Sequence, residues 1–409
     1  MTSRAEKQAW RPGDYFDLSV IGLTHGLSDG FSNMLVPVLA LIVVDLGLSP
    51  FEVGVLLSTF SLGTMIFQYP LSILADNTGA RKRILLIGMG VSAASFIAMI
   101  WVSRFLPMCA LAFLAGAGNS VYHPCGTALA ANRFERDRAF AISWHSLGGN
   151  LGTSILPLIQ AAVAAVAGWR AAVGACAAPA IALLPMVNAR FHEERHQKEP
   201  ETEKRTDLKV FSIIRRVVEN RNTVWLAATY TLRSMCTKGM IGFLPLLATS
   251  NLGMNTAQIG VAVSLHFGFG MLAKPLMGIL YDRWGARAAL FWPMTLLGVF
   301  VLGLPFMKWQ TGFYVLSALT GVVGFVSPII LTAAADFSEK DILASSVGFI
   351  YTCHGLSFLA PLLGGWLAGQ VSLDASYFCF AIMSWLAVST SAQLRGKKQR
   401  PDNPRRQDT

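Results

Sequence analysis

The chain has 409 residues, of which 53% are hydrophobic and 14% charged, and its formal net charge is +10. Soluble proteins average about 45–50% apolar and about 25% charged residues, so this composition excludes an ordinary soluble domain and predicts a membrane protein. The positive charge lies mainly in tails and loops between apolar runs, a pattern that indicates membrane topology and not nucleic-acid binding. The lipid bilayer is therefore the expected surrounding.

Apolar runs near the roughly 18–20 residues needed to cross hydrocarbon recur along the whole chain. The runs are continuously apolar and do not alternate, which predicts helices and not a β-barrel. We predict twelve spans, at 18–44, 51–74, 84–103, 106–131, 139–161, 170–188, 223–250, 257–281, 288–306, 311–335, 344–369 and 373–394.

The positions of Lys and Arg predict the orientation. Only Arg104, Arg170 and Lys308 lie in odd-numbered loops, whereas the tails, the central linker and the even-numbered loops carry most of the rest. By the positive-inside rule both termini are expected in the cytoplasm of a multi-pass protein, with the bacterial inner membrane as its location. Residues 1–17 are polar without an apolar core, so no cleavable signal peptide is expected.

The first predicted span carries two ionisable residues, His25 and Asp29. Charged groups at a helix centre cost roughly 2.5–3.5 kcal/mol on insertion scales, so such residues are functional candidates. A spacing of i, i+4 places the two side chains on one helical face. We predict that Asp29, assisted by His25, carries a coupling proton; the alternative is a hydrogen-bonded pair that holds this helix against its neighbours.

Polar residues also interrupt the fourth and fifth spans. His123 lies four positions after Asn119, and the following Pro124 disturbs the helix, so this segment can line a cavity or form a purely structural kink. We assign candidate substrate contacts at His123, Asn119, Tyr122, His145 and Asn150. His145, like His266 and His354, stands alone on its helix, where helix packing is the alternative role.

The stretch at 189–222 is charged and separates the two sets of spans. Residues 207–218 place apolar side chains at helical spacing beside basic ones, which predicts a short amphipathic helix on the cytoplasmic membrane face. The predicted organisation is a cytoplasmic tail at 1–17, a six-helix bundle at 18–188, the linker at 189–222, a second six-helix bundle at 223–394 and a basic cytoplasmic tail at 395–409.

The second half carries embedded cations: Arg233 and Lys238 in the seventh span and Lys274 in the eighth. No acid lies near them at helical spacing, so their partners are expected across the cavity or in the substrate. Arginine's planar fork matches a carboxylate or phosphonate, which favours an anionic or zwitterionic substrate. The alternatives are a pair between Asp29 and Arg233 or Lys238, and a Lys274 that snorkels to the cytoplasmic surface.

The two halves repeat each other at a fixed offset of 206 positions (251 minus 45). Residues 45–55 return at 251–261, and the sequence LADNTGAR at 74–81 returns as LYDRWGAR at 280–287. Internal repeats in a long hydrophobic chain are typical of secondary transporters, whose substrate site lies between the halves near the bilayer midplane. The predicted fold is thus all-α, with two pseudo-symmetric six-helix bundles.

Twelve spans, two repeated halves and an Asp-x-x-Gly-x-Arg loop after the second and eighth spans resemble the major facilitator superfamily. The resemblance implies that these loops latch the inner gate. It assigns gating roles to Asp76, Arg81, Asp282, Arg283 and Arg287, while the first loop departs from the family pattern at Ser72, Asn77 and Ala80.

Three polar segments, THGLSD at 24–29, GAGNSVYHP at 116–124 and GGNLG at 148–152, resemble the fosmidomycin-resistance-type branch, largely drug exporters. That branch usually continues His-Pro with Glu, whereas this chain has Cys125, so the substrate or coupling chemistry can differ.

No Walker sequence is present, so direct ATP use is not expected. The strings GLSDG at 26–30 and HEERH at 192–196 match the letters of G-x-S-x-G and H-E-x-x-H, but the first lies inside an apolar span and not at a strand-to-helix turn, and the second lies in the charged linker. An enzyme and a resident cofactor are therefore not expected. We predict a monomeric, proton-coupled transporter that exports a small organic or drug-like anion by alternating access. The alternatives are a proton-coupled importer and a transport-inactive receptor. Movement of a soft metal, using Met235 with Met240 or His266 with Met271, is disfavoured because residues five apart do not share a helical face. No metal site is assigned.

Overall fold

The computed structural model describes residues 11–193, 207–339 and 342–395, and every regular element within these ranges is a helix. Eight helical segments are long and apolar enough to cross a membrane. Two of them, Glu135–Arg190 and Thr256–Phe306, hold 56 and 51 residues, more than twice the roughly 20 that one crossing needs. The predicted all-α membrane fold is confirmed.

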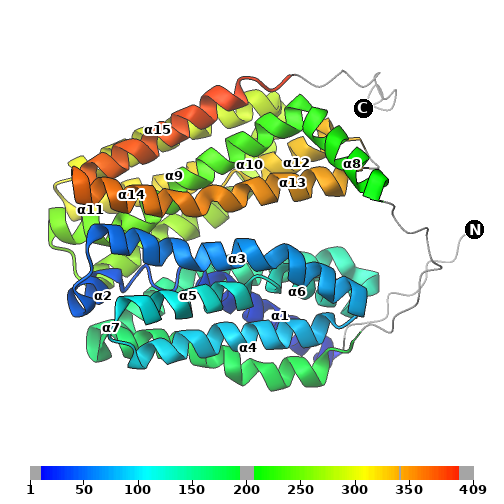
Figure 1. Cartoon of the computed structure of the whole chain (residues 1–409), viewed down its shortest axis with the longest axis horizontal. Coiled ribbons are helices and arrows are strands. Elements are labelled where there is room, and N and C mark those ends of the chain that lie inside the picture. The colour runs from blue at the N-terminus through cyan, green and yellow to red at the C-terminus, as the bar shows by residue number, and fades with distance from the viewer. Residues whose placement is uncertain (1–10, 194–206, 340–341, 396–409) are drawn as a thin grey trace, which may run out of the picture.

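The helices form two bundles that lie side by side (Figure 1). The first contains α1 (Pro12–Phe31), α2 (Leu39–Leu46), α3 (Pro50–Thr78), α4 (Arg81–Ala98), η1 (Met99–Trp101), α5 (Phe105–Asn119), α6 (Tyr122–Arg133), η2 (Glu135–Asp137) and α7 (Arg138–Arg190). The second contains α9 (Arg221–Leu252), α10 (Thr256–Gly303), η3 (Leu304–Phe306), α11 (Gln310–Gly324), α12 (Ser327–Phe337), α13 (Leu343–Gly355), η5 (Leu356–Phe358), α14 (Leu359–Gln370) and α15 (Leu373–Ser391). The linker contributes α8 (Asp207–Glu219).

Several predicted boundaries differ from the observed helices. The predicted spans at 139–161 and 170–188 are joined within α7, because Gly168 adopts φ 78° and turns the chain without a loop. Gly285, with φ 71°, does the same within α10. The first predicted span divides into α1 and α2, and α1 begins at Pro12, inside the stretch predicted as a polar tail.

The sequence repeat has a counterpart in the backbone. Gly47 and Gly253, at equivalent positions, both adopt a left-handed conformation, with φ of 63° and 59°. Each is followed by a reciprocal helix cap: Ser49 caps α3 and Asn255 caps α10, each paired with the side chain three residues later. The two halves therefore begin their second spans with the same turn and cap.

The bundles are in close contact near these caps, through a symmetry-related pair of glycines. Gly54 of α3 packs against the Pro361 carbonyl and against Gly365 of α14. Its repeat partner Gly260, of α10, packs against Ala161 and the Pro157 carbonyl of α7. Small residues let helix backbones approach closely in a membrane. These contacts join the two bundles at the end away from the α3–α4 turn.

A buried carboxylate ties three helix ends together at the opposite end of the first bundle. Asp17 of α1 is fully buried and accepts from Arg133 Nε of α6 at 2.8 Å and from Arg190 Nε of α7 at 2.5 Å. Arg133 also contacts Asp14 at 2.9 Å. The Arg11 amide, helped by Arg133, lowers the pKa of the Asp14 carboxyl, so Asp14 stays ionised at neutral pH.

We expect Asp17→Ala to lower the thermal stability of the purified protein, because two guanidinium groups lose a buried acceptor. The expected loss is about 2 kcal/mol, the range for hydrogen bonds to charged groups. The control is Asp45→Ala, which breaks a 2.7 Å pair with Arg170 in which both side chains are more than 30% exposed; an exposed pair contributes only about 0–1 kcal/mol. Equal melting temperatures for the two variants would contradict the structural role of Asp17.

A helix, α8, lies where the amphipathic pattern predicts one. Its Val217 is buried, whereas Ile214 and Val218 are 54% and 49% exposed and available to lipid. The chain before it is anchored to the first bundle: the Glu193 carboxylate accepts from the backbone amides of Lys82 and Arg83, at the start of α4. Anionic groups at helix N-termini are stabilising.

Candidate functional site

Glycines bring the two site-bearing helices α1 and α7 into backbone contact. Gly22 and Gly26 on α1 face Gly148 and Gly152 on α7, and a side chain at any of the last three would collide with backbone atoms of the other helix. This is the small-xxx-small packing typical of membrane helices. It places His25 and Asp29, which neighbour these glycines on α1, directly against Gly149.

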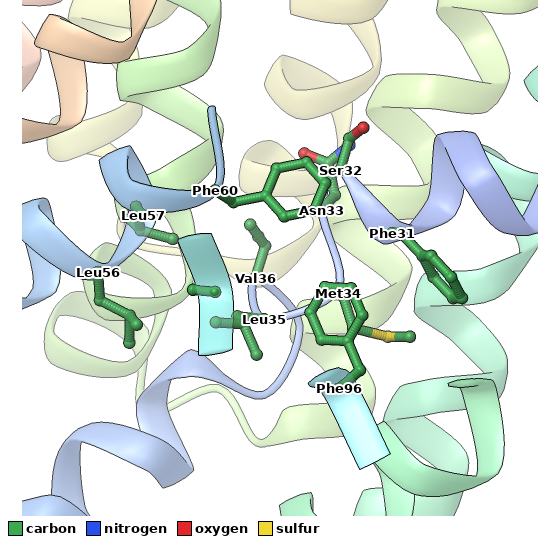
Figure 2. A pocket seen from close by; sticks show the side chains of 11 residues that line it. Phe31, Ser32, Asn33, Met34, Leu35, Val36, Leu56, Leu57, Phe60 and Phe96 are labelled. Carbon is green, nitrogen blue, oxygen red and sulfur yellow. The ribbon is translucent and has the colours of Figure 1, made fainter. Parts of the chain in front are cut away.

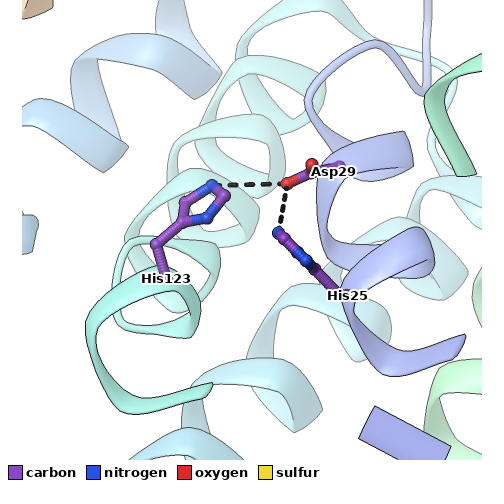
Figure 3. A group of neighbouring side chains, drawn as sticks. All are labelled: His25, Asp29 and His123. Carbon is purple, nitrogen blue, oxygen red and sulfur yellow. Dashed lines mark ion pairs between the residues drawn. The ribbon is translucent and has the colours of Figure 1, made fainter. Parts of the chain in front are cut away.

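Asp29 stands between two histidines from different helices (Figure 3). Its Oδ1 lies 3.3 Å from Nε2 of His25 on α1 and 3.3 Å from Nε2 of His123 on α6. The sequence predicts the first contact from i, i+4 spacing. The second contact joins Asp29, which is predicted to carry the coupling proton, to His123, which is predicted to contact the substrate.

His145 adds a third imidazole behind this group. It is buried, and its ring stacks on that of His25 with centroids 3.9 Å apart. Its backbone carbonyl lies 2.6 Å from His25 Nδ1. A carbonyl only accepts, so Nδ1 of His25 carries a hydrogen, and Nε2 is the nitrogen that gains or loses a proton beside Asp29.

Two other predicted substrate contacts have their polar groups bonded inside the first bundle. The amide of Asn119 is buried and exchanges hydrogen bonds with Ser28, at 2.9 Å and 3.1 Å. The Tyr122 hydroxyl lies 2.7 Å from Thr24 Oγ1 and donates to the Ile21 carbonyl. Both residues therefore hold α1 in position, and their placement does not favour contact with substrate.

The cations of the second half gather around one aromatic ring. The Arg233 guanidinium and the Lys274 ammonium lie 6.0 Å and 5.5 Å from the centroid of Phe325, at the break between α11 and α12. Lys238, also on α9, reaches across to Ser61 of α3 at 3.4 Å. In the described part of the chain no carboxylate lies within 4.0 Å of these three cations, so the predicted alternative pairing with Asp29 is not observed.

One contact joins the two halves of the site. Lys274 Nζ donates to Asn150 Oδ1 at 2.5 Å, so this lysine points into the protein and the alternative of a snorkelling Lys274 is not observed. Asn150 adjoins Gly149, the residue that backs His25 and Asp29. A continuous set of contacts thus runs from Arg233 through the Phe325 ring to the carboxylate of the first half.

The gating residues lie in the turns predicted for them. Arg81 Nη2 pairs with Asp76 at 2.8 Å within the α3–α4 turn. Asp282, Arg283 and Arg287 are exposed beside the Gly285 turn, and none of them forms an ion pair with another described residue. Their gating role remains a prediction.

Sequence reasoning missed Phe325 and Asp17. Phe325 lies in a helix break, at residues 325–326, that repeats the one at Ser120 with the same 206-position offset (326 minus 120). Discontinuous helices in corresponding positions are a pointer to a binding site. Asp17 gave no signal, because charged residues flanking an apolar run resemble an ordinary tail.

Figure 2 shows a separate hollow where α1 ends, rimmed by Ser32 and Asn33 and otherwise apolar, with Met34, Leu56 and Phe60 among its lining residues. No predicted site residue lines it, so it is not the candidate site.

The ligand atoms of His25, Asp29 and His123 lie within 4.8 Å of one another, a spacing that fits a shared proton and also admits a metal ion. His266, from the soft-metal alternative, bonds Thr320 at 2.9 Å.

Helical bundles with embedded charges at their interface are typical of a membrane transporter. A family model of the Major Facilitator Superfamily matches residues 21–255 and 226–408, and the chain belongs to this family. The predicted resemblance is thereby confirmed, and the protein is a multi-pass membrane transporter.

Individual relatives agree with this assignment. The fosmidomycin resistance protein of Escherichia coli is 22% identical over 389 residues, which cover 91% of each chain. The probable nitrate transporter NarT of Staphylococcus haemolyticus is 20% identical, over 90% of this chain and 93% of its own. A bacterial homologue of the human lysosomal transporter Spinster, in an inward-facing, unoccupied conformation, shares the fold with a TM-score of 0.80 and 14% identity, over 94% of this chain and 98% of its own.

Proposed function

We propose that this transporter exports a small organic anion in exchange for protons. The observation that carries the anion is the state of Arg233: its Nε is buried without a hydrogen-bond partner, and no described carboxylate pairs with it. An unpaired buried donor on a charged group is costly, so a ligand that supplies the missing acceptor binds favourably. A phosphonate or carboxylate would do so in a bidentate manner.

We assign the coupling proton to the part of the site that the first bundle forms. His25, Asp29 and His123 lie on the opposite side of the Lys274–Asn150 contact from Arg233, so the proposed site has an acidic and a cationic part. In alternating access the two bundles would rock against each other, and this motion would carry the anion and the proton across the membrane in opposite directions. With both termini in the cytoplasm of a bacterial inner membrane, the Gly54 and Gly260 contacts would close the outer end, leaving the cavity open inward.

Two observations favour a second candidate, proton-coupled import. Some relatives are named nitrate transporters, and an ionised Asp29 opposes a second negative charge in the same cavity. The two directions differ in linkage: an exchanged proton weakens anion binding, whereas a co-transported proton strengthens it. Titrating fosmidomycin, as a phosphonate probe, into purified protein at two pH values therefore separates them; tighter binding at the lower pH would favour import.

We expect Arg233→Ala to raise the apparent Km for a phosphonate by about 10-fold or more, because a hydrogen-bonded charge contributes about 1.5–3 kcal/mol. Uptake of radiolabelled fosmidomycin into inside-out vesicles measures it. Arg104→Ala, in an exposed loop position, is the control and should keep the wild-type Km. An unchanged Km in Arg233→Ala would show that the anion does not bind at Arg233 on α9.

A further inference from the structure

We propose that His123 is the residue through which the coupling proton enters and leaves the His25–Asp29 pair. This inference rests on the proposed proton coupling and gives His123 a role other than the substrate contact expected from the sequence. It follows from which atoms face one another and from how exposed each side chain is.

The His25–Asp29 pair is built to hold one proton. Nδ1 of His25 is committed to the His145 carbonyl, so a neutral His25 turns the lone pair of Nε2 toward Asp29 Oδ1, 3.3 Å away. A lone pair facing a carboxylate is repulsive, and one proton on either group removes the repulsion. Protonated His25 beside ionised Asp29, or neutral His25 beside protonated Asp29, are the two arrangements that satisfy the contact.

Both members of the pair are less exposed than His123. The His25 side chain is 7% exposed and that of Asp29 is 22% exposed, whereas His123 is 55% exposed. The other faces are occupied: Gly149 backs the Asp29 carboxylate, and the rings of Tyr122 and His145 lie parallel to that of His25, at 5.4 Å and 3.9 Å. Of the three side chains, that of His123 is therefore the most exposed.

The transfer conserves protons and charge at each step. His123, protonated on Nε2, gives that proton to Asp29 Oδ1, so the imidazolium becomes neutral and the carboxylate becomes a neutral acid. Asp29 then passes the proton to Nε2 of His25, which restores the carboxylate and forms the His25 imidazolium. His123 is left free to take another proton from water, and release follows the reverse order.

The charged and titratable groups around this path come from α6, α7 and α10. His145 on α7 and Tyr122 on α6 flank His25, and Lys274 on α10 approaches through Asn150. A positive Lys274 favours an ionised Asp29 and opposes the His25 imidazolium. Proton entry through His123 is therefore coupled to whatever ligand draws Lys274 away from Asn150.

The test needs no identified substrate. Proteoliposomes on a solid-supported membrane are given a pH jump, and the transient current reports the amount and rate of proton binding. His123→Gln keeps the polarity and approximate size of the side chain but cannot carry the proton. We expect it to slow the current by roughly 10²-fold, the lower range for a lost general acid–base group, and to leave the displaced charge unchanged. Added imidazole should restore part of the rate in His123→Ala.

A matched control is His354→Gln, which alters a histidine of α13 stacked on Tyr230 and should keep the wild-type rate. Unchanged current kinetics in His123→Gln would overturn the relay, as would a slowed current that imidazole does not restore. Failure of the proposed function looks different: the wild-type protein would then show no transport driven by a pH gradient, whatever the current of the His123 variants.

Discussion

Replacing Asp29 with asparagine should abolish accumulation driven by a pH gradient while leaving membrane insertion and folding intact. Asparagine matches the carboxylate in size but cannot accept a proton, so the atom shared by His25 and His123 loses its function as a proton site. We expect proteoliposomes containing the variant to show at most about 1% of the wild-type pH-driven flux of fosmidomycin, in line with loss of an essential acid–base group.

Exchange without a gradient gives the internal control for this variant. If the cavity is intact, Asp29→Asn should still equilibrate labelled fosmidomycin across the membrane. Asp45→Asn, which removes a carboxylate from the exposed pair with Arg170, should transport like wild type. Wild-type accumulation by Asp29→Asn would assign the proton to another residue.

Bulky residues at Gly54 or Gly260 should stop the transport cycle. A side chain on Gly54 would meet the Pro361 carbonyl, and one on Gly260 would meet Ala161 and, at 2.9 Å, the Pro157 carbonyl. Backbone cannot move aside as a flexible side chain can, so Gly54→Leu and Gly260→Leu should prevent the bundles from closing at this end. We expect net fosmidomycin flux to fall by at least about 10-fold, as for an overpacking cost of about 1–3 kcal/mol.

Cysteine labelling shows whether the block is conformational. Ser61→Cys lies on α3 at the bundle interface, where the native serine meets Lys238, and a membrane-impermeant maleimide should reach it faster from the outside in the Gly54→Leu background. Gly278→Leu is the control, since nothing lies within 4 Å of a side-chain carbon at that position. Flux lost equally in Gly278→Leu would mean that leucine disturbs these helices generally, not at the closing contact.

Much of the fold, and one of the two histidine contacts of Asp29, could be predicted from the sequence. The offset repeat places Gly47 and Gly253 at equivalent positions, and the structure gives both the same left-handed conformation. The His25–Asp29 contact follows from helical spacing alone. His123 could not be added to that pair, because its approach depends on the break between α5 and α6 and on the angle at which α6 meets α1.

The parts that escaped prediction depend on tertiary contacts between segments far apart in the sequence. Asp17 meets Arg133 and Arg190 only after three helix ends converge. Phe325 is one of 25 phenylalanines, and nothing local distinguishes it until Arg233 and Lys274 are placed around its ring. Asn119 and Tyr122 are predicted substrate contacts because polarity within a span is visible in a sequence, whereas the hydrogen-bond partners that the structure gives them are not.

A ligand-stabilisation screen on purified protein tests the central claim, an anion site at Arg233, most directly. Phosphonates, carboxylates, cationic drugs, neutral sugars and divalent metals would each be added at two pH values, since a ligand that binds the native state raises the melting temperature by mass action. We predict that phosphonates or carboxylates raise the melting temperature of the wild type and lose this effect in Arg233→Ala. Stabilisation by neutral sugars or metals alone would contradict the anion site.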